Sequence, residues 1–400
     1  MSRNEDHSKR QAGARIITRR SFMAATAAGA AAVFAPAIIG RAQSVTTVKL
    51  GHTEPLTGPS APYGIRAMDG SKVAVAEIKT AGGFQDSKGN RYVFEMTEDD
   101  MANDPKQAVT LFRQQVLDSR IVVSVGPTNS VGYIPLIPIA GQLKLPLVGC
   151  GSGAPVKQWN PYAFRVNPVA STAVPVVLER VQKIHKVKRL ALIYDQTQDG
   201  QVGDATVVRE MQGKLGYELV VSDAFRANDQ DFSPQIAKIK NAKPDAIYVA
   251  AATGDGVKLV TQIRAAGLDM PLITGYGSFQ DPVYWDGTKG GVKDGYTWLA
   301  QDLGSASGAL KQWLDRYNKQ FKNEATSFST YGYDAVYAVA EAIKRAASAE
   351  REKVRAALAG LALTSPIGTR ITFKNPPSGE NQTPSVAVIK VTGRGTYVAA

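Results

Sequence analysis

Short apolar segments alternate with amphipathic helical segments along most of this chain, and this alternation limits its fold more than any other feature. Residues 47–52 predict the first strand, and Ile65, Met68, Val75 and Ile78 follow at helical spacing. The same rhythm predicts strands at 92–96, 121–125, 145–148, 189–194, 217–221, 246–250 and 272–274. Strands separated by helices of this length predict mostly parallel sheets with helices on both faces.

The number of predicted strands exceeds what one ordinary doubly wound sheet holds. We therefore expect two α/β domains, because 400 residues are enough to build two hydrophobic cores. Residues 307–359 are predicted to be mostly helical. The tail returns to strand-like runs at 370–373 and 386–391.

Residues 1–42 have the layout of an export signal. Arg19 and Arg20 form a twin-arginine pair, an apolar run covers 23–39, and small residues frame Arg41. This order is typical of a bacterial twin-arginine signal peptide, so we expect the twin-arginine translocase as an export partner, cleavage near Ala42 and a periplasmic protein. The apolar run is short and Ala-rich for a membrane span, although an uncleaved anchor stays the alternative.

The basic charge of the chain does not indicate nucleic acid. The net charge is +12, and residues 1–42 carry seven basic and two acidic groups, which leaves +7 on the remainder. The remaining Lys and Arg are scattered over the polar faces of predicted helices. We interpret them as solvated helix faces and expect no nucleic-acid partner.

The residues that carry catalysis in other proteins are scarce here. The chain has three histidines and one cysteine, Cys150, and no His or Cys pair has the spacing of a metal site. We interpret Cys150 as a buried structural thiol rather than a nucleophile. The run 253–256 lacks the third glycine of a dinucleotide fingerprint. The sequence thus predicts no enzyme, catalytic residue, metal or cofactor, and an exported redox or hydrolytic enzyme is the alternative.

Polar loops rich in Ser, Thr, Gly and Tyr recur where predicted strands end. In open parallel sheets, ligands bind at this edge, and the N–H groups of helix N-termini suit a carboxylate. Each loop taken singly has the composition of an ordinary turn, but their recurrence indicates one site for a small polar ligand. These loops are 57–63, 128–130, 149–154, 253–254 and 276–278.

The segment 47–84, with its Pro55-Leu56-Thr57-Gly58-Pro59 turn, resembles the opening of the branched-chain amino-acid-type periplasmic solute-binding proteins of ABC transporters. The similarity covers essentially the whole chain after the signal, and the ordered set of motifs is more specific than any one of them. The motifs continue at 99–100, 104–108, 125–127, 144–148 and 231–250.

This resemblance implies the periplasmic binding protein type I fold, with two Rossmann-like lobes. The first lobe would hold 45–166 and 300–366, and the second 167–299 and 367–400. Three hinge crossings would join them near 164–168, 297–301 and 365–369. A small molecule would bind in the cleft between the lobes, hinge closure would bury it, and a membrane ABC permease would recognise the closed form. We expect a monomer. A ligand sensor of the same fold, which passes closure to a signalling receptor, is a further alternative.

The resemblance also assigns ligand-binding positions in both expected lobes. In the first lobe they are Tyr63, Ser130, Gly151, Ser152 and Gly153, where Gly153 takes the place of a threonine usual in the family. In the second lobe they are Asp199, Thr253, Tyr276, Gly277 and Ser278.

The second lobe departs from the family pattern in one informative place. Amino-acid binders often carry an acid after the strand at 272–274, where this chain has Gly275-Tyr276-Gly277-Ser278-Phe279. An ammonium group buried without a carboxylate is costly, which argues against leucine, isoleucine or valine unless Asp199 or Asp281 replaces that acid. The predicted ligand is a small carboxylate: an amino acid, a related organic acid or an amide. Aromatic residues expected near it are Tyr63, Tyr276, Phe279, Tyr284 and Trp285.

Overall fold

The computed structural model describes residues 45–275 and 279–400. The expected signal peptide at 1–42 and the loop positions Tyr276, Gly277 and Ser278 lie outside the described residues. Within the described ranges, no helix is both long and apolar enough to cross a membrane.

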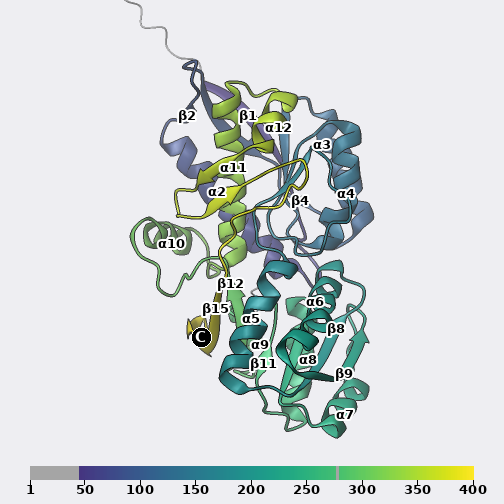
Figure 1. Cartoon of the computed structure of the whole chain (residues 1–400). Helices are drawn as coiled ribbons and strands as arrows, with labels where there is room; N and C mark the ends of the chain where they lie inside the picture. Colours follow the sequence, from purple (N-terminus) through teal and green to yellow (C-terminus); the bar gives the residue numbers. More distant parts are fainter. Residues whose placement is uncertain (1–44, 276–278) are drawn as a thin grey trace, which may run out of the picture. The chain divides into compact units, whose positions relative to one another are not determined.

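The first of two large sheets is built from the N-terminal third of the described chain (Figure 1). Its strand order is β2-β3-β1-β5-β6-β7, with β4 also paired to β1. All of these neighbours pair in parallel except the edge strand β2. The strands are β1 (Val45–Glu54), β2 (Phe84–Gln85), β3 (Arg91–Met96), β4 (Asp99–Asp100), β5 (Ile121–Val125), β6 (Leu147–Gly149) and β7 (Ala163–Arg165).

Three helices connect the strands of this sheet: α2 (Ala61–Thr80), α3 (Pro105–Leu117) and α4 (Ser130–Leu143). The start of α3 follows from its sequence, because Pro105 fits the first turn and the Asp104 side chain accepts from the N–H groups of Lys106 and Gln107. In the same way, the Asn129 side chain caps α4 by accepting from the N–H of Gly132.

The second large sheet follows in the chain and has the order β16-β15-β12-β11-β10-β8-β9. The five strands from β12 to the edge strand β9 pair in parallel, while β15 and β16 add an antiparallel edge on the other side. The strands are β8 (Arg189–Asp195), β9 (Glu218–Phe225), β10 (Ala246–Ala250), β11 (Leu272–Ile273), β12 (Tyr296–Leu299), β15 (Ala387–Gly393) and β16 (Thr396–Ala399). The helices are α5 (Ala170–His185), α6 (Asp199–Leu215), α7 (Ser233–Ala242), α8 (Thr253–Ala265) and α9 (Pro282–Gly287).

The segment after β12 returns to the first sheet. It forms α10 (Gly308–Gln320), α11 (Ser327–Ala346) and α12 (Arg351–Ala359), followed by the hairpin β13 (Ala362–Thr364) and β14 (Arg370–Thr372). Helix α11 packs along α2, and the aromatic rings of Tyr63 and Phe328 stack there with centroids 4.5 Å apart. The return places α11 beside α2, the first helix of the described chain (Figure 1).

The predicted α/β class with mostly parallel sheets is confirmed. The region 307–359 is helical, as predicted, and the strands alternate with helices as the apolar pattern indicated. One expected hinge crossing has a different structure: 365–369 is the turn of the β13–β14 hairpin, where the N–H of Ser365 donates to the carbonyl of Thr369. The N–H of Asn381 donates to the carbonyl of Arg165 on β7, so the chain stays with the first sheet beyond that turn.

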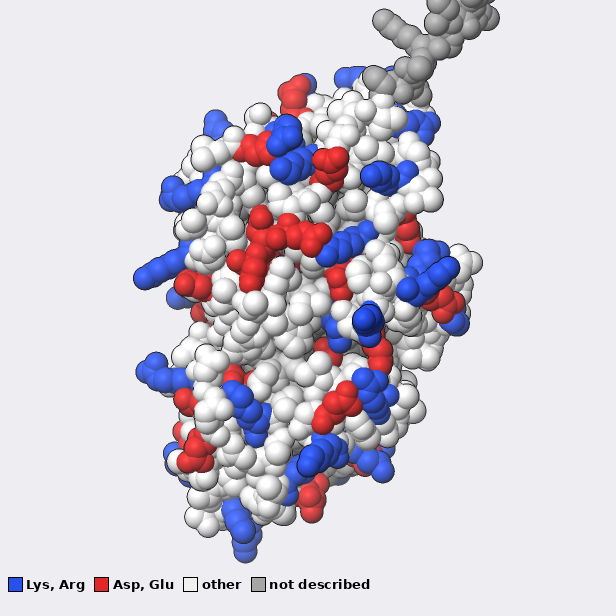
Figure 2. Space-filling model, turned by 180° about the vertical axis from the view of Figure 1, so that it is seen from behind, with Lys and Arg blue, Asp and Glu red and all other residues white. Residues whose placement is uncertain are grey.

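The surface charges are mixed. On the face shown in Figure 2, Lys and Arg side chains lie among Asp and Glu and form no continuous basic band. Many of the described charges form pairs, such as Lys311 with Asp315 and Arg394 with Asp286. This distribution matches the interpretation of the basic residues as solvated surface groups.

Candidate functional site

Three helices begin around one small cavity, two that flank the first sheet and one that flanks the second. The cavity lies at the N-termini of α2, α4 and α6, and its volume of about 20 Å³ is comparable to the space that one water molecule needs. The N-cap side chains of α2 and α6, Ser60 and Gln198, do not cap their helices. Helix N-termini carry N–H groups and partial positive charge, so this arrangement favours an anion. The lining residues are Ser60, Tyr63, Thr128, Asn129, Ser130, Gln198, Gly200 and Gln201.

Direct contacts across this cavity join elements of the two sheets. The Tyr63 hydroxyl donates to the carbonyl of Ala251 at 3.4 Å, and the N–H of Gly254 donates to the carbonyl of Pro59 at 3.3 Å. A Cβ at Gly200 would lie 3.3 Å from the hydroxyl of Ser130. Described elements of the two sheets therefore contact each other beside this cavity.

Two of the predicted first-lobe residues bond to each other. The hydroxyls of Ser130 and Ser152 lie 3.0 Å apart, and the N–H of Ala154 donates to the Ser130 oxygen at 3.1 Å. Both serines are buried. The loop that carries Gly151, Ser152 and Gly153 thus lies directly behind the cavity wall.

A buried guanidinium holds this loop from behind. Arg165 of β7 donates to the carbonyls of Ser152 and Ala154 at 3.1 and 2.7 Å, and it pairs with Glu380 at 2.6 Å. Asn167 also donates to the carbonyl of Ser152, at 2.9 Å. These bonds fix the loop conformation in the part of the chain where the sequence predicts ligand contact, although the sequence analysis did not select Arg165.

The two described residues that were predicted for the second lobe differ in their surroundings. Asp199, the first residue of α6, is exposed and lines a larger cavity of about 870 Å³ between α4, α6 and the 154–160 loop. Thr253, the first residue of α8, is fully buried, and its hydroxyl has no hydrogen-bond partner among the described residues. The predicted positions Tyr276, Gly277 and Ser278 lie outside the described residues.

The acid proposed as an ammonium partner, Asp281, already faces a cation. It caps α9 by accepting from the N–H of Val283, and its Oδ1 lies 3.4 Å from Nη2 of Arg66. Burial raises the pKa of Asp281, while the nearby Arg66 charge opposes that rise. Asp281 therefore belongs to an ion pair and Asp199 is exposed, so neither is a free buried carboxylate.

A second buried carboxyl, which the sequence analysis missed, lies inside α6. Asp204 is fully buried, accepts from the Tyr248 hydroxyl at 3.1 Å and faces Gly275. Burial raises the pKa of Asp204 to about 7, against a smaller lowering effect of the Tyr248 bond. The sequence did contain a signal for it: Asp204 stands between Gly203 and Ala205 as a lone acid on the apolar face of a helical segment.

Three of the expected pocket aromatics, all within the described residues, pack against other rings of the protein. Tyr63 stacks on Phe328 beside the cavity, whereas Phe279 and Tyr284 pack edge to face with centroids 5.1 Å apart in the core of the second sheet. Tyr284 is fully buried there, and its hydroxyl has no partner among the described residues. Of these rings, Tyr63 lines the cavity.

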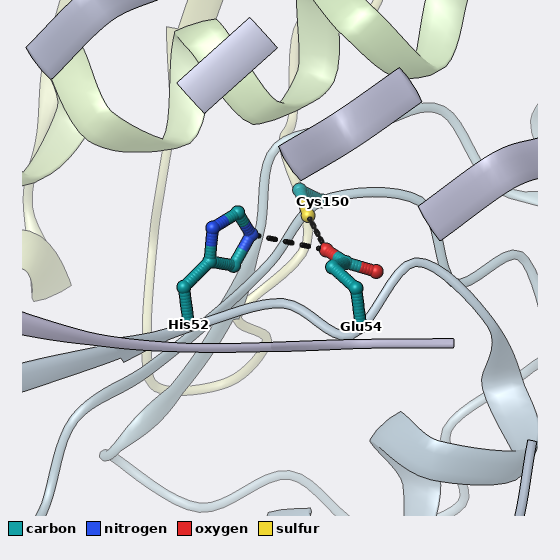
Figure 3. Close-up of side chains that lie close together, drawn as sticks. All are labelled: His52, Glu54 and Cys150. Atoms are coloured by element: carbon teal, nitrogen blue, oxygen red, sulfur yellow. Dashed lines mark hydrogen bonds and ion pairs between the residues drawn. The ribbon is translucent and has the colours of Figure 1, made fainter. Parts of the chain in front are cut away.

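A cluster of three buried side chains lies near the cavity and was also missed by the sequence analysis. Nε2 of His52 and Sγ of Cys150 lie 3.2 and 3.0 Å from Oε1 of Glu54 (Figure 3). The other carboxylate oxygen accepts from the N–H and the hydroxyl of Thr128, both at 2.8 Å. Burial and the adjacent Glu54 carboxylate raise the pKa of Cys150 well above its ordinary value. Spacing along the chain could not reveal this cluster, because Glu54 and Cys150 are 96 positions apart.

These features define a class: an α/β protein with two mostly parallel sheets, in which the N-termini of three helices converge on one small cavity. The sequence model of the periplasmic binding protein family matches residues 47–395, so this chain belongs to that family. Within it, the chain is a type I periplasmic binding protein of the branched-chain amino-acid group.

Curated relatives share about a quarter of the sequence. The chain is 26% identical over 324 residues to the leucine-, isoleucine-, valine-, threonine- and alanine-binding protein of Pseudomonas aeruginosa, which covers 80% of this chain and 84% of the relative. It is 29% identical over 311 residues to the Leu/Ile/Val-binding protein BraC3 of Rhizobium johnstonii, which covers 76% and 80%.

Solved structures have the same fold. The leucine-binding protein LivK of Thermotoga maritima superposes with a TM-score of 0.78 at 23% identity, covering 88% of this chain and 97% of that one. A solute-binding protein of Rhodopseudomonas palustris BisB5 in complex with 3,4-dihydroxybenzoic acid gives 0.76 at 22% identity, covering 88% and 98%.

The family is periplasmic, and its members are solute-binding proteins rather than enzymes. This confirms the prediction of a binding protein over that of an exported enzyme.

Proposed function

We propose that this protein is the extracytoplasmic solute-binding component of an ABC importer and captures a small carboxylate between two lobes. The convergence of helix N-termini from both sheets on one cavity carries this proposal. A carboxylate placed there would accept N–H bonds from both sides, so it would stabilise the closed form more than the open form. Its greater affinity for the closed form would drive closure.

The two lobes of the proposal follow the expected division with one change. The first lobe would hold 45–166, 300–366 and also 367–382, because the backbone of Asn381 and Gln382 bonds to Arg165 and Thr372. The second lobe would hold 167–299 and 383–400, with the sheet that contains β15. Hinges would then lie near 164–168, 297–301 and 383–386.

We place the ligand contacts at the positions chosen from the sequence. The hydroxyls of Ser130 and Ser152, the ring of Tyr63 and the backbone at Gly151 and Gly153 would serve the first lobe. The buried hydroxyl of Thr253 would serve the second lobe, together with Tyr276, Gly277 and Ser278. Asp199 would lie at the rim, because its side chain is exposed.

We favour an acid without an ammonium group as the ligand. The cavity-lining residues of the described chain include no charged side chain, and the buried Asp281 is already paired with Arg66. An α-ammonium would therefore find no free carboxylate in the described wall of this cavity, and the buried Asp204 beside Gly275 already accepts from the Tyr248 hydroxyl. Neighbouring structures bind acids of this kind: one is in complex with 3,4-dihydroxybenzoic acid and another with benzoate.

The proposed partners follow from the same role. A membrane ABC permease would accept the ligand from the closed, monomeric protein, which the twin-arginine translocase would have exported and a peptidase cleaved near Ala42. The relatives and neighbours with printed ligands are amino-acid-binding proteins or solute-binding proteins of ABC transporters, which supports a role in uptake over sensing.

Thermal unfolding of the purified protein against a ligand panel tests the proposal. The panel holds leucine, isoleucine, valine, benzoate, 3,4-dihydroxybenzoate, aliphatic oxo acids and the matching amides. A ligand at a hundred times its Kd adds about 2.7 kcal/mol of stability, which gives a clear rise in Tm. A rise with acids that lack an ammonium group is expected.

One variant and its matched control test where the ligand binds. Ser130→Ala should weaken binding about tenfold or more, because a hydrogen bond to a charged group contributes about 1.5–3 kcal/mol. Ser305→Ala is the matched control, since Ser305 is exposed and lies away from the cavity. A response to α-amino acids alone would overturn the ligand class, and no response to any small carboxylate would overturn the capture role.

A further inference from the structure

Three side chains with metal-binding atoms meet at the carboxyl edge of the first sheet. His52 and Glu54 are two residues apart on β1, so they point to the same face of the sheet. Cys150 directly follows β6, and β5 separates β6 from β1 in the sheet. Nε2, a carboxylate oxygen and Sγ of these residues all lie within 4.8 Å of one another, and all three side chains are buried (Figure 3).

The spacing of these atoms suits a small divalent cation. Zinc binds nitrogen and oxygen at about 2.0–2.2 Å and sulfur at about 2.3 Å, so neighbouring ligands of a tetrahedral site lie roughly 3.3–3.7 Å apart. Oε1 of Glu54 lies 3.2 Å from Nε2 of His52 and 3.0 Å from Sγ of Cys150. Movements of a few tenths of an ångström would open this space. The thiol would release its proton to solvent, and the neutral imidazole would carry its one proton on Nδ1, which leaves the Nε2 lone pair for the cation.

The surroundings supply the support that a metal ligand needs. Oε2 of Glu54 accepts two bonds from Thr128, which fix the carboxylate and leave Oε1 for the cation. Nδ1 of His52 is buried without a hydrogen-bond partner among the described residues. Binding through Nε2 would leave this nitrogen without a partner as well, so the proposal rests on the geometry of Nε2, Oε1 and Sγ.

We propose that His52, Glu54 and Cys150 form a binding site for one zinc-class divalent cation, with Nε2, Oε1 and Sγ as ligands. One thiolate, one imidazole and one carboxylate form a borderline-soft set that suits zinc better than magnesium or calcium. The remaining coordination position would take water. The site does not depend on the proposed carboxylate ligand.

The cation would act on the ligand cavity through Thr128. This residue bonds to Glu54 and also lines the cavity, next to Asn129 and Ser130. A metal-bound Glu54 would hold the 126–130 loop more rigidly, so the bound cation would raise the Tm and support the proposed site. Because the three ligands are buried, binding should be slow in the folded protein.

Cobalt(II) titration of the purified full-length protein tests the site. Cys150 is the sole cysteine of the chain, so any thiolate-to-cobalt charge-transfer band in the near ultraviolet reports this residue. We expect one cobalt per chain, a band that zinc abolishes by competition, and a higher Tm with either metal. The metal is added during refolding, which removes the barrier of burial.

Variants separate this site from adventitious binding. Cys150→Ser should remove the charge-transfer band, and His52→Gln should weaken cobalt binding at least tenfold. His185→Gln is the matched control, because His185 contacts Tyr296 and lies outside the cluster. A wild-type protein that refolds with cobalt and shows no charge-transfer band overturns the proposal, even if Cys150→Ser does not fold. Equal binding by wild-type protein and His52→Gln overturns it as well.

Discussion

Arg66 of α2 and Asp281 at the N-cap of α9 form a buried ion pair between a helix of the first sheet and a helix of the second. Nη2 and Oδ1 lie 3.4 Å apart, and both side chains are less than 10% exposed. A second contact lies beside it, where the Gln280 side chain donates to the Ser327 hydroxyl at 3.3 Å. If the protein opens between the sheets, this pair must separate.

Arg66→Gln should therefore weaken ligand binding. The substitution leaves Asp281 buried without its cation, and such a loss costs about 3–5 kcal/mol when both groups are fully buried. We expect at least a tenfold higher Kd by calorimetry, because the cost falls on the closed form. Asp281→Asn in the same chain should recover part of the affinity.

Lys311→Gln is the control, since Lys311 pairs with Asp315 on the surface and such pairs contribute little. Unchanged affinity in Arg66→Gln would show that the pair does not take part in closure.

The contact between α2 and α11 leads to a second prediction. Gly70 faces the backbone of Ser329, and Gly332 faces the backbone of Ala67, so neither has room for a Cβ. Gly332→Ala should lower the free energy of unfolding by about 1–3 kcal/mol through overpacking. Gly213→Ala in α6 should raise it by about 0.5–1 kcal/mol, because this helical glycine has no atom nearby. Urea unfolding measures both, and equal effects would contradict this account.

Much of the fold could be predicted because it depends on local patterns. The apolar strands, the Asp104-Pro105 helix start and the helical region 307–359 all carry signals within a few residues. The turn at 365–369 was expected as a hinge, because family resemblance gave its position but not its hydrogen bonds.

The clusters could not be predicted, because they depend on strand order. The Cys150 thiol reaches Glu54 only after β5 pairs with both β1 and β6. The Arg66–Asp281 pair likewise joins residues 215 positions apart. Tyr284 was expected near the ligand, but its aromatic ring is equally suited to the core, where the structure places it.

Asp204 predicts a pH dependence of stability. Burial raises the pKa of this carboxyl to about 7 in the folded protein, while an unfolded aspartate has a pKa of about 3.9. Between these values the folded state holds a proton that the unfolded state has lost, so this group makes stability fall as pH rises from about 4 to about 7. The slope is about 1.4 kcal/mol per pH unit for one proton.

Asp204→Asn should remove this contribution and flatten the slope, as measured by urea unfolding from pH 4.5 to 8. Asp334, whose pKa burial also raises to about 7, keeps its own contribution in that variant. The exposed Asp315→Asn is the control. An unchanged slope in Asp204→Asn would mean that the group is ionised throughout this range.

Thr253 gives a prediction with opposite signs for stability and binding. Its hydroxyl is buried at the start of α8 and has no partner among the described residues, so removing it should cost the ligand-free protein little stability or even raise it. If this hydroxyl binds the ligand, Thr253→Val should raise the Kd about tenfold. Thr274→Val is the contrasting variant, because its hydroxyl donates to the carbonyl of Val249 at 2.7 Å and its loss should lower stability by about 1 kcal/mol. Thermal unfolding measures the stability of both variants, and calorimetry measures their ligand affinity. If Thr253→Val loses stability yet keeps full affinity, the hydroxyl serves the fold instead of the site.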